Sequence, residues 1–153
     1  MEQDLINRIS NFIHPNSEID LSGIPATDLE IINAETILNV KFHSDYKEFI
    51  KKFGGSYAGI PIYAFKNNEM LSSDTVIDLT KNFRQDYHED RRSNIINKSY
   101  VISFDDMGNP IMIDKDENMI IFYHDSDGYA ILTNSFASLI QGILEGKSLY
   151  DFN

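Results

Sequence analysis

Cysteine is absent from the 153-residue sequence. This absence excludes a disulfide framework and any metal site built on thiolate ligands. It is typical of proteins from the reducing cytosol, so we predict a cytoplasmic protein. Stability must therefore come from a hydrophobic core, and a chain of this length buries about two thirds of its unfolded surface as one domain. We expect a single domain over residues 1–153.

Long apolar runs and an excess of basic residues are missing as well. No stretch approaches the roughly 20 apolar residues of a membrane-spanning helix. The N-terminal sequence carries acids, in MEQDLINRIS, where a secretory signal has positive charge. The net charge is −11, from 13 basic and 24 acidic residues, which opposes binding to nucleic-acid phosphates. We therefore expect no membrane and no nucleic-acid partner, and we favour a basic protein as partner.

Sequence signatures of catalysis are also missing. There is no G-x-S-x-G elbow, no H-E-x-x-H motif and no phosphate-binding glycine loop. The histidines share no metal-ligand spacing; they are His14, His43, His88 and His124. We predict no catalytic residue, no metal and no cofactor, and a protein that is not an enzyme.

The first half of the chain has the apolar periodicity of helices. One helix is predicted from Leu5 to Ile13, one from the capping box Thr27-x-x-Glu30 to about Leu38, and one capped by Ser44 and ended by Gly54-Gly55. The stretch AGIPIYAF suits a strand or an irregular extended segment. A further helix is predicted from Asp74 to about His88, capped by Ser72 or Ser73, and the charged run HEDRRSN is interpreted as a solvated connection.

The second half changes to the apolar alternation of strands. Strands are predicted at residues 100–104, 111–113, 119–123 and 129–132, joined by three tight turns. Such short connections permit antiparallel neighbours only. A last helix is predicted from Phe136 to Leu144, capped by Asn134 or Ser135 and stopped by Gly146. The predicted fold class is α+β, an antiparallel β-meander sheet flanked by N-terminal helices and a C-terminal helix.

Three acidic clusters, DDMGN, DKDEN and HDSDG, occupy the turns between these strands. A calcium loop starting at Asp114 would have Asp116, Asn118 and Asp125 at ligand positions, but it has Met119 where the sharp turn needs glycine. We therefore favour hairpin turns over a calcium site. In an antiparallel meander, DDMGN and HDSDG are expected at one end of the sheet and DKDEN at the other.

Asp105 and Asp106 are neighbouring carboxylates, a pattern that could serve as an acid–base pair. Catalysis would need the pKa of one of them to be raised by burial or by the charge of the other. The tip of a turn exposed to water supplies little of either. We therefore interpret both residues as part of a turn.

A family resemblance follows from the order of three segments, LEIINAETILNVKFHSDYKEFIKKFGG, YVISFDDMGNPIMIDKD and NSFASLIQGIL. Together they resemble the SUKH superfamily, which includes yeast cell-wall-assembly regulators and many bacterial immunity proteins. The resemblance spans residues from about 24 to 145, and it rests on Ala34-Glu35, Phe53-Gly54-Gly55, Gly108-Asn109 and Ser135-Phe136. The chain departs from the family at Phe42-His43, where Leu-Pro is common. The resemblance implies a single SUKH-like domain.

The resemblance implies a bacterial immunity protein that binds a cognate toxin, often a nuclease, without catalysis. The alternative that it leaves open is a regulatory scaffold of the cell-wall-regulator type. Basic nucleases would be attracted to the turns, because residues 105–127 hold seven acids against one lysine, a net charge of −6. The predicted partner-binding residues are Asp105, Asp106, Asp114, Asp116, Glu117, Asp125 and Asp127, with Tyr123, Tyr129 and Phe122 as candidate aromatic anchors.

Overall fold

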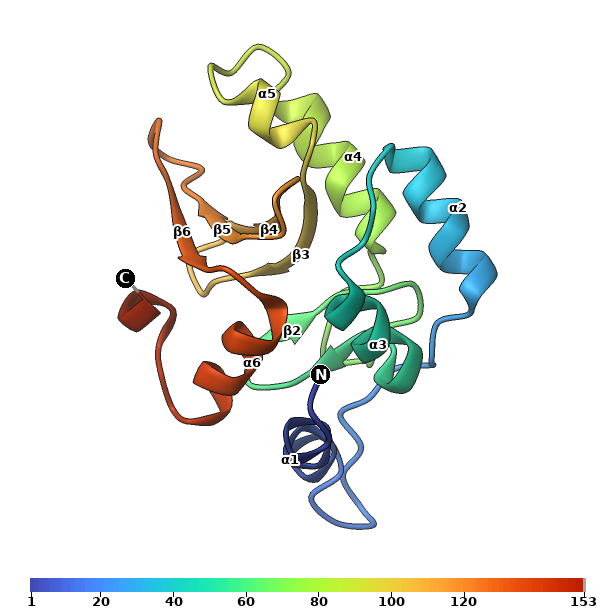
Figure 1. The fold of residues 1–153 in the computed structure, drawn as a ribbon. Coiled ribbons are helices and arrows are strands. Elements are labelled where there is room, and N and C mark those ends of the chain that lie inside the picture. Colours follow the sequence, from blue (N-terminus) through green and yellow to red (C-terminus); the bar gives the residue numbers. More distant parts are fainter. Residues whose placement is uncertain (153) are drawn as a thin grey trace.

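The structure, a computed structural model, describes residues 1–152. Its helices are α1 (Gln3–Ile13), α2 (Asp28–Leu38), α3 (Ser44–Phe53), α4 (Val76–Asp86), α5 (Ser93–Ile96), α6 (Phe136–Leu144) and the 3-10 helix η1 (Leu149–Phe152). Its strands are β1 (Ser56–Tyr57), β2 (Pro61–Ile62), β3 (Tyr100–Phe104), β4 (Pro110–Ile113), β5 (Met119–Phe122) and β6 (Tyr129–Thr133). In Figure 1, α5 and α1 lie at opposite ends of the molecule, with the sheet between α5 and α6. The predicted α+β class is confirmed.

The second and third helices begin at different kinds of cap. Thr27 Oγ1 accepts a hydrogen bond from Glu30 N (3.1 Å), and Glu30 Oε1 accepts one from Thr27 N (2.9 Å), so the predicted capping box is confirmed. The predicted cap at Ser44 is wrong, because Ser44 is already the first helical residue of α3. The cap is His43, whose Nδ1 accepts a hydrogen bond from Asp45 N (3.0 Å). The departure from Leu-Pro at Phe42-His43 thus supplies the helix with its cap.

The cap of α4 also differs from its prediction. Thr75 Oγ1 accepts a hydrogen bond from Asp78 N, and an Asp78 carboxylate oxygen accepts one from Thr75 N. Ser72 and Ser73 are therefore not the cap. They lie in the preceding loop, where Ser72 O accepts a hydrogen bond from Asn67 Nδ2 (3.0 Å). α4 therefore begins at Val76, directly after the Thr75 cap.

The segment after α3 is irregular and extended. Gly54 has φ of 66° and ends α3, as predicted, and a Cβ at this position would lie 2.2 Å from Ile24 O. Only Pro61–Ile62 of AGIPIYAF forms a strand, paired antiparallel with β1. The next residue, Tyr63, donates its N–H to Ile102 O (2.9 Å), which places the segment against β3.

The sheet has the strand order β3-β4-β5-β6, and all its neighbours are antiparallel. One face packs on the main core with α3 and α6, through Tyr100, Ile102, Ile111, Ile113, Met119, Ile121 and Leu132. The other face packs on α4 and α5, through Val101, Met112, Ile120 and Phe122. Because both faces of the two central strands are covered, β4 and β5 are continuous apolar runs in the sequence. The predicted meander is confirmed.

An aromatic cluster joins the helical half to the sheet. The ring of Phe42 stacks on that of Tyr100, with centroids 4.6 Å apart. Tyr46 donates its hydroxyl hydrogen to Tyr63 O (2.6 Å), and the hydroxyl oxygen of Tyr100 accepts a hydrogen bond from His43 N (2.8 Å). Burial raises the pKa of Tyr46 and of Tyr100, so both phenols stay protonated in the folded protein.

The first and last α-helices meet at one end of the molecule. α1 contacts α6, and Arg8 Nη2 lies 3.7 Å from Glu145 Oε1. The apolar face of α1, with Leu5, Ile9 and Ile13, is buried in the main core. Within residues 1–152, no helix combines the length and the apolar character needed to cross a membrane.

Candidate functional site

The turn between β3 and β4 is organised by Asp105. Its Oδ1 accepts hydrogen bonds from Met107 N (2.9 Å) and Asn109 N (2.8 Å), and its Oδ2 accepts one from Asn109 Nδ2 (2.9 Å). Gly108 supplies the positive φ, 81°, that this turn needs. The carboxylate of Asp105 is therefore used inside the turn, whereas the neighbouring Asp106 is exposed.

A second acidic turn is bound directly to the first. Asn109 Oδ1 accepts a hydrogen bond from His124 N (3.0 Å) and lies 2.6 Å from His124 Nδ1. DDMGN and HDSDG therefore share one end of the sheet, as predicted. We call this surface, Asp105–Asn109 together with His124–Gly128, the paired-turn end.

A buried arginine holds the second turn in place. Arg92 Nη1 donates to Tyr123 O (3.0 Å) and Gly128 O (2.7 Å), and its guanidinium carbon lies 3.6 Å from the centre of the Phe122 ring. Arg92 Nε lies 2.8 Å from Asp90 Oδ1, and the side chains are only 7% and 18% exposed. The hydrogen bonds from Arg92 lower the pKa of Asp90 to about 2. HEDRRSN is therefore not wholly a solvated connection, because Arg92 is buried and α5 begins at Ser93.

Most acids of the paired-turn end face water. Asp106, Asp125 and Asp127 are exposed. Asp127 has one cation nearby, with Arg91 Nη2 at 3.3 Å from its Oδ2, and both side chains are largely exposed. Among residues 1–152, the carboxylates of Asp106 and Asp125 make no hydrogen bond or ion pair. The surface thus keeps a net negative charge that is accessible to a partner.

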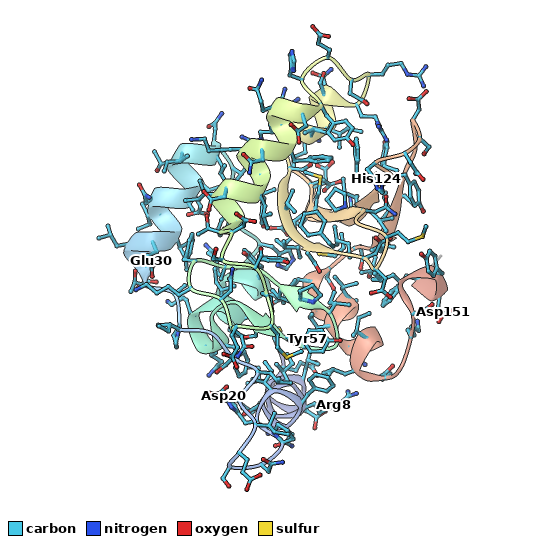
Figure 2. All side chains as sticks on the ribbon, turned by 180° about the vertical axis from the view of Figure 1, so that it is seen from behind. Arg8, Asp20, Glu30, Tyr57, His124 and Asp151 are labelled. Atoms are coloured by element: carbon cyan, nitrogen blue, oxygen red, sulfur yellow. The ribbon has the colours of Figure 1, made fainter. Side chains whose placement is uncertain are left out.

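Two large apolar side chains lie exposed among these acids. Met107 is 65% exposed at the tip of its turn, and Tyr150 of η1 is 66% exposed. The Tyr150 hydroxyl lies 3.7 Å from the Met107 sulfur. In Figure 2, Asp151 of the same short helix and His124 lie on the same side of the molecule, far from Glu30 of α2. Methionine and tyrosine are both enriched in protein interfaces, so the pair is a suitable apolar centre for an acidic rim.

The third acidic turn, DKDEN, repeats the first at the opposite end of the sheet. Asp114 Oδ1 accepts hydrogen bonds from Asp116 N (2.9 Å) and Asn118 N (2.9 Å), and Asn118 Nδ2 donates to Asp114 Oδ2 (3.2 Å). Glu117 occupies the place of Gly108, with φ of 68°. Within residues 1–152, no three His, Asp or Glu side chains are grouped as metal ligands.

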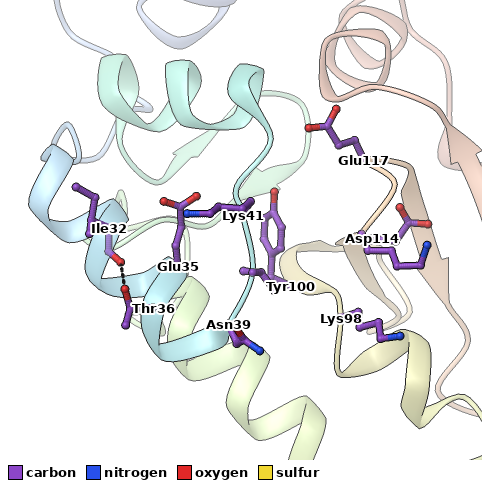
Figure 3. Close-up of a pocket in the computed structure, with 11 residues that line it drawn as sticks. Ile32, Glu35, Thr36, Asn39, Lys41, Lys98, Tyr100, Asp114 and Glu117 are labelled. Carbon is purple, nitrogen blue, oxygen red and sulfur yellow. Dashed lines mark hydrogen bonds between the residues drawn. The ribbon is translucent and has the colours of Figure 1, made fainter.

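A cavity of about 630 Å³ separates this third turn from α2. Figure 3 shows Glu35 and Lys41 on one side of it and Asp114 and Glu117 on the other, with Tyr100 between them. His43 Nε2 lies 3.8 Å from Glu117 Oε2. Acids and lysines both line the cavity, so its charge is mixed.

The family described as SMI1-KNR4 cell-wall, SUKH_5, matches residues 3–145. The chain belongs to this SUKH family. The match covers α1 to α6 and all three acidic turns, and it ends before η1, which carries Tyr150. Comparison with curated proteins gives no match.

Family membership supports an immunity-protein-like or regulatory SUKH-domain role. Within the SUKH fold, the predicted site residues fall into two groups rather than one face. Asp105, Asp106, Asp125 and Asp127 belong to the paired-turn end, whereas Asp114, Asp116 and Glu117 belong to the third turn. The acidic residues of the meander therefore form two separate surfaces.

The predicted aromatic anchors differ in their exposure. Phe122 is 0% exposed beneath Arg92, so its interpretation as an anchor is wrong. Tyr123 is half-buried and packs against the main core, and Tyr129 is exposed on β6. Sequence reasoning missed Met107 and Tyr150. A signal existed for Met107, since an apolar side chain at the tip of an acidic turn is unusual.

Proposed function

We propose that this SUKH protein is a bacterial immunity protein that acts in the cytoplasm. It neutralises a cognate basic toxin, of the nuclease type, by stoichiometric binding and without catalysis. The observation that supports this most is the paired-turn end, whose exposed acids are joined by the exposed side chain of Met107, in contact with Tyr150 of η1. Acids accelerate association with a basic partner, and exposed apolar side chains slow its dissociation once they are buried.

The test of this function uses the protein encoded by the neighbouring gene. Co-expression should protect the cell from that protein, and the two purified chains should form a tight complex of one copy each. A neighbour that is not toxic, or that does not bind, would overturn the proposal.

The binding surface is tested by charge reversal. Asp106→Lys with Asp125→Lys should lower the association rate about tenfold at low salt, and added salt should shrink the difference. A matched control, Asp4→Lys with Glu18→Lys, makes the same charge change at exposed sites on α1 and the loop after it. Equal effects of the two variants would show that total charge matters and that the paired-turn end does not.

The apolar pair is tested through dissociation. Met107→Ala with Tyr150→Ala should raise the dissociation rate about thirtyfold, as expected for two interface hot-spot residues. Both side chains are exposed, so the melting temperature of the free protein should change little. An unchanged dissociation rate would remove this pair from the interface.

A second function, regulatory scaffolding, is favoured by the family's cell-wall description. In that case the same surface would bind an endogenous partner. Affinity capture that recovers one housekeeping protein, with no toxin encoded nearby, would support it over immunity. Capture of a toxin in the same amount as the housekeeping protein would exclude the scaffold function.

A further inference from the structure

The two edge strands of the sheet differ in what covers their outer backbone. On β3, Ile102 O accepts a hydrogen bond from Tyr63 N (2.9 Å), and Val101 N donates one to Thr80 Oγ1 (2.9 Å). These bonds occupy the edge, so no further strand can be added there. β6 is the other edge of the sheet.

η1 lies close to β6, but the outer backbone of the strand makes no hydrogen bond among residues 1–152. Tyr123 N donates to Gly128 O (3.1 Å), and Ala130 pairs with Ile121 of β5. Since successive residues of a strand alternate in direction, the N–H and C=O groups of Tyr129 and Ile131 point away from β5. Among residues 1–152, no other backbone or side-chain group forms a hydrogen bond with them.

The side chains of the same two residues are also accessible. Tyr129 is 45% exposed and Ile131 50% exposed, on the face of the sheet that carries Phe122 and Ile120. Together with Ile95 of α5 and residues of the third acidic turn, they line a groove of about 340 Å³. The strand sequence YAILT contains no charge and no proline, the features that usually protect an edge from pairing.

We propose that β6 binds an extended segment of the basic partner as a fifth, hydrogen-bonded strand of the sheet. The identity of that partner rests on the proposed function. The turn that leads into β6 belongs to the paired-turn end, so one partner can contact Asp125 and Asp127 and continue along the edge. Alternate side chains of the added strand would pack on Tyr129 and Ile131 in the groove.

The negative charge of this chain favours binding of a basic segment at the β6 edge over pairing with a second copy of the chain. Two copies joined edge to edge would each bring a net charge of −11. Near the edge, Lys115 Nζ is paired with Asp116 (2.9 Å) and Arg91 Nη2 with Asp127 (3.3 Å), while Asp125 has no cation among residues 1–152. Lys98 and Lys115 line the groove together with Asp114 and Asp116, whose charges balance theirs, so basic side chains of the partner are expected toward the Asp125 end.

The main test removes one outward N–H. Ile131→Pro deletes a group that the fold does not use, whereas Ile131→Thr keeps the N–H and loses a similar amount of apolar surface. With the toxin encoded by the neighbouring gene, Ile131→Pro should weaken binding about tenfold or more, and Ile131→Thr by less than about threefold. Ala130→Pro, which removes an inward N–H, should lower the melting temperature and so verify the orientation of the strand.

Hydrogen exchange gives the second readout. The amides of Tyr129 and Ile131 should exchange quickly in the free protein and at least tenfold more slowly in the complex. Equal binding by the two Ile131 variants, with unchanged exchange in a stable complex, would overturn the added strand and leave the immunity function standing. Protection of both amides in the free protein, with sedimentation as a dimer, would assign the edge to self-association and also overturn the proposal. A toxin that fails to bind the wild-type protein would instead overturn the function on which it rests.

Discussion

The first and third acidic turns have the same hydrogen bonds in different surroundings. Each begins with an aspartate whose Oδ1 accepts two backbone N–H groups and ends with an asparagine that donates to the same carboxylate. In the first turn the left-handed residue is Gly108, and Asn109 continues to His124. In the third turn that residue is Glu117, beside the cavity under α2. The same hydrogen-bonded turn therefore has different consequences at the two ends of the sheet. At the paired-turn end its asparagine binds a second turn, whereas in the third turn a non-glycine residue keeps an unfavourable positive φ.

The largest loss of stability is expected from substitution of Arg92, which holds the second turn at the paired-turn end. Arg92→Ala removes the groups that hold Tyr123 O and Gly128 O, and it leaves Asp90 without its partner. The free energy of unfolding should fall by about 3 kcal/mol, measured by urea denaturation. Arg91→Ala is the control, because the Arg91–Asp127 pair is exposed and should contribute less than about 1 kcal/mol. Similar losses in both variants would contradict the structural role of Arg92.

The two turn aspartates give the next largest effect. Asp105→Ala and Asp114→Ala each remove an acceptor of backbone N–H groups, so each should cost about 1–2 kcal/mol of unfolding free energy. Only Asp105→Ala frees Asn109, so only this variant should shift the amide resonance of His124 in NMR spectra. A shift of His124 in Asp114→Ala would show that the two ends are not independent.

Substitutions at the residue with positive φ should change the stability of the protein in opposite directions in the two turns. Glu117→Gly should stabilise the protein by up to about 1 kcal/mol, because glycine adopts φ of 68° without a steric penalty. Gly108→Ala should destabilise it by about 1 kcal/mol. A Cβ at Gly108 meets nothing within 4 Å, so this loss reports the backbone alone. Thermal melts of both variants check the pair, and a less stable Glu117→Gly would indicate that the Glu117 side chain contributes more than its backbone costs.

A further prediction is a pH dependence that involves Asp90, the ion-pair partner of Arg92. The pKa of Asp90 is lowered to about 2, below its ordinary value of 3.8. The stabilisation by Arg92 is therefore complete above about pH 4 and is lost as the pH falls through about 2. Unfolding curves between these pH values should show a steeper loss for the wild type than for Asp90→Asn. Parallel curves would show that the Asp90–Arg92 pair does not contribute.

The features that the sequence predicted correctly are local ones. The capping box of Thr27 and Glu30 lies within a few residues, and the meander follows from short apolar segments separated by turns too short for parallel strands. Arg92 was missed because its burial depends on carbonyl groups about thirty residues further along the chain. Tyr150 was missed for the same reason, since only the folded chain brings it to Met107. The cap of α4 was a different error, because Thr75-x-x-Asp78 was visible in the sequence.

The packing of α1 on α6 has a consequence for biosynthesis. The two helices lie near opposite ends of the described chain, so α1 leaves the ribosome long before its partner is made. Until α6 is made, α1 lacks the packing that α6 supplies in the finished protein. The nascent chain therefore exposes part of the apolar face of α1 during the interval in which chaperones bind exposed apolar segments.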